Sequence, residues 1–251
     1  MLNLQDYVPL KRAKNKRKTL IISAIIISVI ILFFLIIYFV IFTKSKSKKE
    51  FLETSIYYVC AAKSKNKKEL ENMQDDVKNF GGAGKIYQKD EMYYLVLNAY
   101  YDKNSADLVA ENNKEIYQDV NVLELKTKGV SNKTINKFKK SEVNFRFLKK
   151  MNSDLNAILD LQMKYLSGDI TENDLCSKLL TLKFDNDDLI YDIKSFEEND
   201  FKDLVLNYAN LKEIYFSTFF NSFFESDKKS SVICEFVVNL TLLKVDFFNN
   251  L

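Results

Sequence analysis

Two stretches of the chain repeat one pattern, and this repeat limits the fold more than any other feature. One is IYYVCAAKSKNKKEL, residues 56–70, and the other is MYYLVLNAYYDKNSADL, residues 92–108. Each starts with a Tyr-Tyr pair in a short run of apolar, β-branched and aromatic residues, which predicts a strand. Each then continues through a polar turn into an apolar pattern with helical spacing. The chain therefore contains a strand–turn–helix unit twice.

A further strand is predicted after each helix. The glycines of GGAG, residues 81–84, end the first helix, and KIYQ, residues 85–88, follows as a strand. VNVLEL, residues 120–125, is the last strand, so the order over residues 55–126 is β-α-β-β-α-β. Each half is too small to cover its own sheet and helix faces. Joined, the halves are expected to form one four-stranded antiparallel sheet with both helices on one side.

Alternation along the strands predicts what lies on the opposite face of this sheet. Side chains two residues apart share a face, which places Tyr58 with Cys60 and Tyr94 with Val96. We expect this face to be open to solvent. Its tyrosines each offer a flat apolar ring for the C–H face of a sugar and a hydroxyl for its polar edge.

Residues 55–126 resemble a known family, the SPOR (sporulation-related repeat) domains of bacterial envelope proteins. The residues that carry the resemblance are YVCAAKS, residues 58–64, and NAY, residues 98–100, followed six residues after Tyr100 by Ala106. The resemblance implies binding of peptidoglycan glycan strands that lack stem peptides, through the open sheet face and its adjoining loops. The candidate glycan-binding residues on this basis are Tyr58, Cys60, Tyr87, Tyr94, Val96 and Asn98.

Several positions depart from the family pattern. Cys60 stands where the family has a glutamine, and Asn98-Ala99 stands where it has Gly-Pro. A thiol is a weak hydrogen-bonding group and does not replace a carboxamide against sugar hydroxyls. A second interpretation is therefore kept open, in which the tyrosines cover the sheet against the next domain.

An uninterrupted apolar run precedes this domain. LIISAIIISVIILFFLIIYFVIF, residues 20–42, is 23 residues long and has no charge. As a helix it would be about 34 Å long, enough to cross a hydrocarbon core of about 30 Å. The sequence therefore predicts a transmembrane helix at residues 20–43, between a basic tail at 1–19 and a linker at 44–54.

Basic residues flank this run on both sides and set the expected orientation. Six Lys and Arg lie at residues 11–18 and four Lys lie at residues 44–49. The larger number on the N-terminal side predicts a cytoplasmic tail and a single-pass protein of the cell membrane, with the bulk of the chain extracytoplasmic.

Composition excludes several functions. The chain has no histidine, so it has no imidazole base, no Ser-His or Cys-His nucleophile and no histidine metal ligand. Cys60, Cys176 and Cys234 lie far apart without a C-x-x-C motif, which predicts buried free thiols and no zinc site. We expect no enzyme, cofactor or metal. Residues 1–53 contain 10 Lys and Arg against 3 Asp and Glu, whereas residues 54–251 contain 27 against 31. The basic excess therefore lies around the apolar run, and no nucleic-acid partner is expected.

The second half has helical patterns. Residues 127–140 are predicted to be a linker and residues 141–251 a helical bundle. Five helices are expected, the second capped by TEND, residues 171–174, and the third beginning at Asp185. IYFSTFFNSFF, residues 214–224, is aromatic on more than one side, and it belongs either to the bundle core or to a contact surface.

These features predict an α+β protein and two alternative functions. The first is a membrane-anchored, non-catalytic envelope protein that binds peptidoglycan glycan strands at division or sporulation septa. Its helical domain would then contact other envelope or divisome proteins. The second is a membrane-anchored assembly or oligomerisation protein of an envelope complex, without glycan binding. The substitution of Cys60 for glutamine favours the second.

Overall fold

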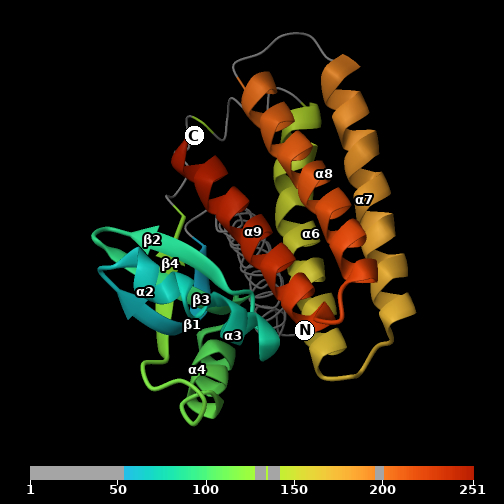
Figure 1. Cartoon of the computed structure of the whole chain (residues 1–251). Coiled ribbons are helices and arrows are strands. Elements are labelled where there is room, and N and C mark those ends of the chain that lie inside the picture. Colours follow the sequence, from blue (N-terminus) through green and yellow to red (C-terminus); the bar gives the residue numbers. More distant parts are fainter. Residues whose placement is uncertain (1–53, 128–133, 135–141, 196–200) are drawn as a thin grey trace, which may run out of the picture. The chain divides into compact units, whose positions relative to one another are not determined.

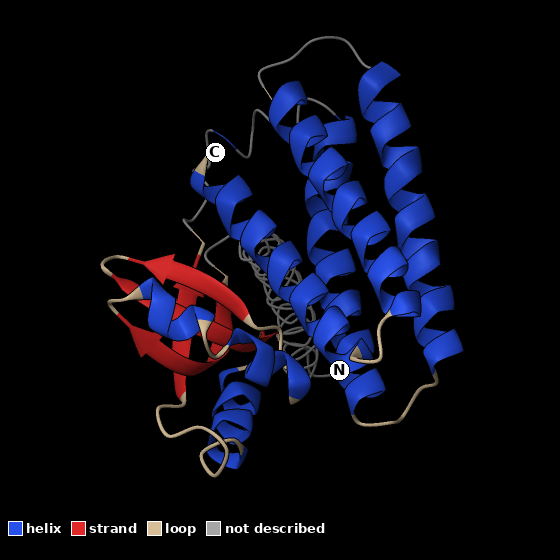
Figure 2. Ribbon diagram, in the orientation of Figure 1, coloured by secondary structure: helices blue, strands red, loops and turns tan. Residues whose placement is uncertain are grey.

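The computed structural model describes residues 54–127, 134, 142–195 and 201–251, which belong to one compact unit. Four strands form one sheet (Figures 1 and 2): β1 (Ser55–Ser64), β2 (Lys85–Lys89), β3 (Met92–Tyr100) and β4 (Asn121–Lys126). The spatial order is β2-β3-β1-β4, and every neighbouring pair is antiparallel. The predicted β-α-β-β-α-β order is confirmed.

Three short helices connect these strands: α2 (Lys67–Glu71), α3 (Gln74–Asn79) and α4 (Lys103–Asn112). The first predicted helix is therefore interrupted between α2 and α3. The glycines end α3 as expected. Gly84 has φ +61°, and a Cβ there would lie 2.7 Å from the Cγ of Lys78, so only glycine fits.

One face of the sheet, called here the back face, is covered by these helices. Its core contains Val59 and Leu95 from the strands, Leu70 and Val77 from α2 and α3, and Ala106 from α4. The apolar positions of the predicted helices therefore pack on the sheet as expected, except Phe80 and Ile116 at the ends of the two stripes, which are 67% and 51% exposed. This core draws on residues close together in sequence.

Four longer helices follow in the described part of the chain: α6 (Glu142–Leu166), α7 (Glu172–Ser195), α8 (Lys202–Glu225) and α9 (Lys229–Asn249). The capping box before α7 is confirmed, because Thr171 Oγ1 accepts from the Asp174 N–H at 3.2 Å and Asp174 Oδ2 accepts from the Thr171 N–H at 3.1 Å. The prediction of a separate helix from Asp185 was wrong. α7 continues through that position.

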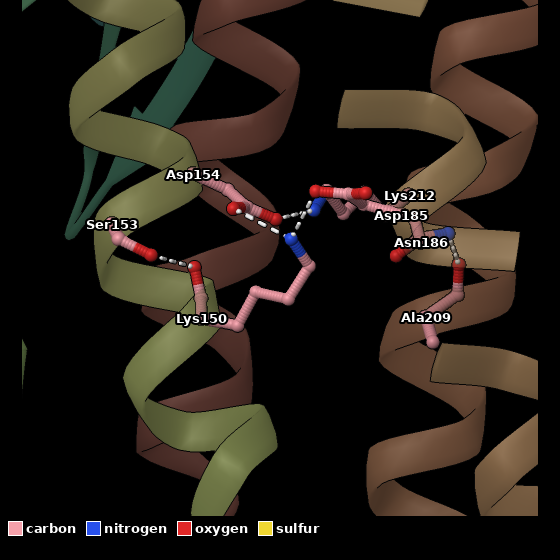
Figure 3. A network of polar contacts seen from close by, with 7 residues as sticks. All are labelled: Lys150, Ser153, Asp154, Asp185, Asn186, Ala209 and Lys212. Carbon is pink, nitrogen blue, oxygen red and sulfur yellow. Dashed lines mark hydrogen bonds and ion pairs between the residues drawn. The ribbon is translucent and has the colours of Figure 1, made fainter. Parts of the chain in front are cut away.

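Polar contacts explain why the acidic stretch does not end α7 (Figure 3). Asp185 accepts from Lys150 Nζ of α6 at 2.9 Å, and the Asn186 amide donates to the Ala209 carbonyl of α8 at 3.2 Å. Asp154 of α6 pairs with Lys212 of α8 at 2.7 Å, and both side chains are buried. Removing one member of such a buried ion pair costs about 3–5 kcal/mol. These polar residues join α6, α7 and α8.

Helix α9 contacts both β3 and the helices α6 and α8 (Figure 1). Ile233, Phe236 and Val237 of α9 belong to one hydrophobic cluster with Tyr58 and Val96 of the sheet. The second face of the sheet, called here the front face, is therefore covered by α9. The prediction that it is open to solvent was wrong.

The fold class needs one correction, which concerns the membrane. Within the described ranges, no helix combines the length and the apolar character needed to cross a bilayer. Even α9, the most apolar of the long helices, carries Lys229, Glu235, Lys244 and Asp246. This finding counts against the predicted single-pass architecture and the membrane localisation. The segment 20–43 lies outside the described residues. The corrected fold class is α+β, with a four-stranded antiparallel sheet and a C-terminal helical region.

Candidate functional site

Five of the six residues predicted to bind glycan share the front face, as the alternation in the strands indicates. Tyr58, Cys60 and Val96 have no exposed surface, and Tyr87 and Tyr94 are partly buried against the same cluster. No ligand can contact the first three in this arrangement, because α9 lies over them. The tyrosines therefore cover the sheet against the helical region, as in the second interpretation of the sequence.

Tyr58 makes the most specific contact across this junction. Its hydroxyl and the Thr241 hydroxyl of α9 lie 2.8 Å apart, and its ring packs edge-on against Tyr87 at 5.9 Å between centroids. Burial raises the pKa of Tyr58 well above its ordinary value, so the phenol stays protonated. A satisfied buried hydroxyl fixes how α9 lies on the sheet, and contributes about 1 kcal/mol.

Cys60 is a buried free thiol, as are Cys176 and Cys234. Burial raises the pKa of the Cys60 thiol, which suppresses the reactive thiolate. Its sulfur lies 3.8 Å from the Tyr58 carbonyl oxygen. Cys60 therefore acts as a small apolar residue of the core.

Asn98, the sixth predicted residue, lies elsewhere because of an irregularity in the sheet. Val59 pairs with Asn98 but Cys60 pairs with Val96, so Leu97 is an extra residue in β3. Asn98 thereby shares a side with Val59, whose side chain belongs to the back core. The bulge separates Asn98 from the front-face tyrosines.

A cleft of about 830 Å³ lies at this point, between the back of the sheet and the helical region. Its described lining comes from the loop after α3, the end of β3, α4 and the turn after it, the end of α6, and the start of α9. The lining residues that matter most below are Phe80, Asn98, Tyr100, Asn113, Tyr117 and Lys228. Tyr87 lines a smaller pocket of about 400 Å³, together with Val245 and Asn249 of α9.

Asn98 is held rigidly at the cleft. Its Oδ1 accepts from Gln162 Nε2 of α6 at 2.7 Å, and its Nδ2 donates to the Tyr100 hydroxyl at 3.0 Å. Burial raises the pKa of Tyr100 to about 12, so its hydroxyl is protonated at neutral pH. The sheet and α6 together fix these polar groups.

Aromatic side chains form another part of the lining. Phe80 is 67% exposed although it is a large apolar residue, and it packs edge-on against Tyr117 with ring centroids 6.3 Å apart. Tyr117 is only 7% exposed, and its hydroxyl has no hydrogen-bond partner among the described residues. A buried polar atom without a partner costs about 1–3 kcal/mol, so it calls for an explanation.

The cleft offers binding groups and no evident catalytic set. Asp227 is the one carboxylate among its described lining residues, so this lining offers no pair of carboxylates for acid–base chemistry. Within the described ranges, no cluster of side chains suited to holding a metal ion occurs. Aromatic rings, amides and lysines together suit a polar ligand with extended apolar faces.

Sequence reasoning found one cleft residue, Asn98, and missed the others. The glycines at residues 81–84 indicate only a helix end, and no motif in the sequence marks Phe80 or the turn before α9 as part of a binding site. Phe80, Tyr117 and Lys228 are distant in sequence and meet because α9 packs on the sheet. No spacing along the chain signals that meeting.

Comparisons with known proteins give little further identification. No family model matches the chain, and no curated protein matches it. A solved structure that matches is the solution structure of the peptidoglycan binding domain of the B. subtilis cell wall lytic enzyme CwlC. It is 22% identical, covers 29% of this chain and 91% of that chain, and has a TM-score of 0.25. At so low a TM-score, the likeness supports no conclusion about the ligand of this chain.

Proposed function

We propose that the chain is a non-catalytic carbohydrate-binding protein of the bacterial cell envelope, which binds peptidoglycan glycan strands in the cleft and not on the front face of the sheet. The observation that carries the proposal is the Phe80 ring, 67% exposed in the lining of a cleft that also contains Asn113 and Lys228. A sugar can place its C–H face on the ring and its hydroxyls against the amide and ammonium groups of the same lining. The family resemblance of residues 55–126 supplies the glycan class.

Cosedimentation of the full-length protein with purified sacculi, before and after amidase removes the stem peptides, tests this proposal. Phe80→Ala is the decisive variant, and we expect it to lower the bound fraction at least severalfold. Phe184→Ala is the matched control, because Phe184 of α7 is similarly exposed, at 61%, and does not line the cleft. No sedimentation of the native protein, or equal loss in both variants, would overturn the proposal.

Location in the cell is part of the same proposal. A fluorescent fusion should accumulate at division or sporulation septa, where glycan strands without stem peptides are expected. The Phe80→Ala fusion should lose that accumulation while the Phe184→Ala fusion keeps it. An even distribution of the native fusion contradicts the septal role.

A second candidate is an assembly protein, and an observation on α7 favours it. Leu180, Phe184 and Tyr191 are exposed at spacings of four and seven residues, which places them on one side of the helix. A second copy of the chain could cover this stripe. Sedimentation velocity decides the matter, since self-association should disappear in a Phe184→Asp, Tyr191→Asp variant. A monomer at all concentrations excludes this candidate.

A further inference from the structure

Helix α7 carries an exposed apolar stripe on the side that faces away from α6 and α8. Leu180, Phe184 and Tyr191 are 37%, 61% and 75% exposed, and their spacing places them on one side of the helix. Leu179 and Leu189, on the opposite side, are buried, and α7 packs against α6 and α8. Large apolar side chains exposed together in this way mark interaction surfaces.

The charges of α7 differ in whether they are already paired within the chain. Asp185, Asp187 and Asp192 each form an ion pair with a described lysine or arginine. Lys178 and Asp188 are exposed, and neither has an opposite charge within ion-pair distance among the described residues. These two charges are available to pair with another molecule.

Both available charges belong to the outer side of α7. Asp188 follows Phe184 by four residues and precedes Tyr191 by three, so it lies in the apolar stripe. At about 3.6 residues per turn, Lys178 lies about 80° round the helix from Asp188, at the edge of the stripe. Any molecule that covers the stripe therefore also covers a carboxylate.

The carboxylate of Asp188 limits how a second copy of the chain can cover the stripe. A carboxylate that becomes buried needs a cation or hydrogen-bond donors beside it. A parallel two-fold pair of α7 helices would place Asp188 next to Asp188 of the partner subunit, and like charges side by side disfavour association. Parallel pairing is therefore excluded on charge.

An antiparallel pair avoids this repulsion. Helix α7 has its midpoint beside Lys183. Two copies paired antiparallel about that midpoint overlap along the whole helix, and the N-terminal half of each lies on the C-terminal half of the other. Lys178 and Asp188 lie five residues before and five residues after Lys183, so each Asp188 meets Lys178 of the partner subunit. The two-fold axis forms this contact twice.

We infer that two copies of the chain pair through the outer sides of α7 in a two-fold symmetric, antiparallel arrangement, in which Lys178 of each copy binds Asp188 of the other. The inference rests on the second candidate function, self-association through α7, and adds the symmetry, the register and the charge pair. No described residue of α7 lines the cleft, so this pairing and glycan binding can hold together.

Sedimentation velocity of the full-length protein and two charge-reversal variants tests the arrangement. Lys178→Asp places two acidic groups at each contact, and Asp188→Lys places two basic groups there. Each variant alone should therefore raise the dissociation constant of the dimer roughly three- to thirtyfold in low salt, and raising the salt should reduce the effect. An equimolar mixture of the two variants should recover the native association, because each contact in a mixed dimer then joins opposite charges. Glu115→Lys, which reverses an exposed charge in the sheet unit, is the matched control and should associate as the native protein does.

The outcomes separate this arrangement from self-association in general. A native protein that stays monomeric at all concentrations overturns both. A native dimer that neither variant weakens overturns the antiparallel register and leaves the second candidate function standing. Variants that associate weakly alone and do not recover when mixed also contradict the register, because the loss then arises within each chain.

Discussion

The two faces of the sheet are covered in different ways. The back face carries α2, α3 and α4, which lie between the strands in sequence, and its core is apolar. The front face carries α9, which follows the last strand by about a hundred residues, and its contacts include the Tyr58–Thr241 hydrogen bond. Packing on the back face stabilises the sheet with its own helices, and packing on the front face joins the sheet to the helical region. A surface predicted to receive a ligand therefore serves as an internal junction.

Truncation of Tyr58 is the strongest test of whether the front face is buried as the back face is. Tyr58→Ala should lower the free energy of unfolding by about 3–5 kcal/mol, because it leaves a cavity under α9 and removes the bond to Thr241. On the back face, Leu95→Ala should cost about 2–5 kcal/mol. Urea unfolding of the full-length protein measures both. A cost below about 1 kcal/mol for Tyr58→Ala, with Leu95→Ala as expected, would mean that the front face is open.

Lys244 of α9 makes the junction sensitive to pH. It is 1% exposed, its Nζ donates to the Tyr101 hydroxyl at 3.4 Å, and burial lowers its pKa from 10.5 to about 8. Between these two values the unfolded chain binds a proton at Lys244 that the folded chain does not. Stability from this group therefore rises as the pH increases from about 8 toward 10.5.

The measurement compares native protein and Lys244→Met by urea unfolding at pH 7.5 and pH 9.5. Over this interval the native protein should gain about 1–2 kcal/mol relative to the variant. The variant removes Lys244 and keeps the other titrating groups, so their contributions cancel. A parallel change with pH in both proteins would show that Lys244 is not buried at this junction.

A double-mutant cycle measures the contribution of the hydrogen bond between the front face and α9. Tyr58→Phe and Thr241→Val each remove one hydroxyl of the pair that joins sheet and helix. Their coupling energy should be about 0.5–1.5 kcal/mol, the net contribution of a hydrogen bond. A coupling energy indistinguishable from zero would show that the two hydroxyls do not interact in the folded protein.

The sheet unit can be predicted well from the sequence, because the signals that specify it act between residues close together in the chain. Period-two alternation puts Tyr58 and Cys60 on one face and Val59 on the other, and the structure agrees. Glycines end α3, and Thr171 and Asp174 begin α7, because these signals act over a few residues. Each of these features needs no knowledge of distant segments.

The remaining features depend on contacts between distant segments. In α9 most of the 21 residues are buried, on several sides, so its pattern indicates burial without indicating what covers it. The bulge at Leu97 that moves Asn98 away from Val96 has no sequence signal comparable to a glycine turn. The cleft forms only once α9 lies on the sheet, so its residues could not be grouped from spacing.

The nuclear Overhauser effect between the Tyr58 ring and the Thr241 methyl group tests most directly whether α9 covers the front face of the sheet. The full-length protein, with these residues isotopically labelled, should give a clear cross-peak, because the two hydroxyl oxygens lie 2.8 Å apart. Contacts between Tyr58 and Tyr87, whose ring centroids are 5.9 Å apart within the sheet, serve as the internal control. Tyr58–Tyr87 cross-peaks without any between Tyr58 and Thr241 would show a folded sheet whose front face is not covered by α9.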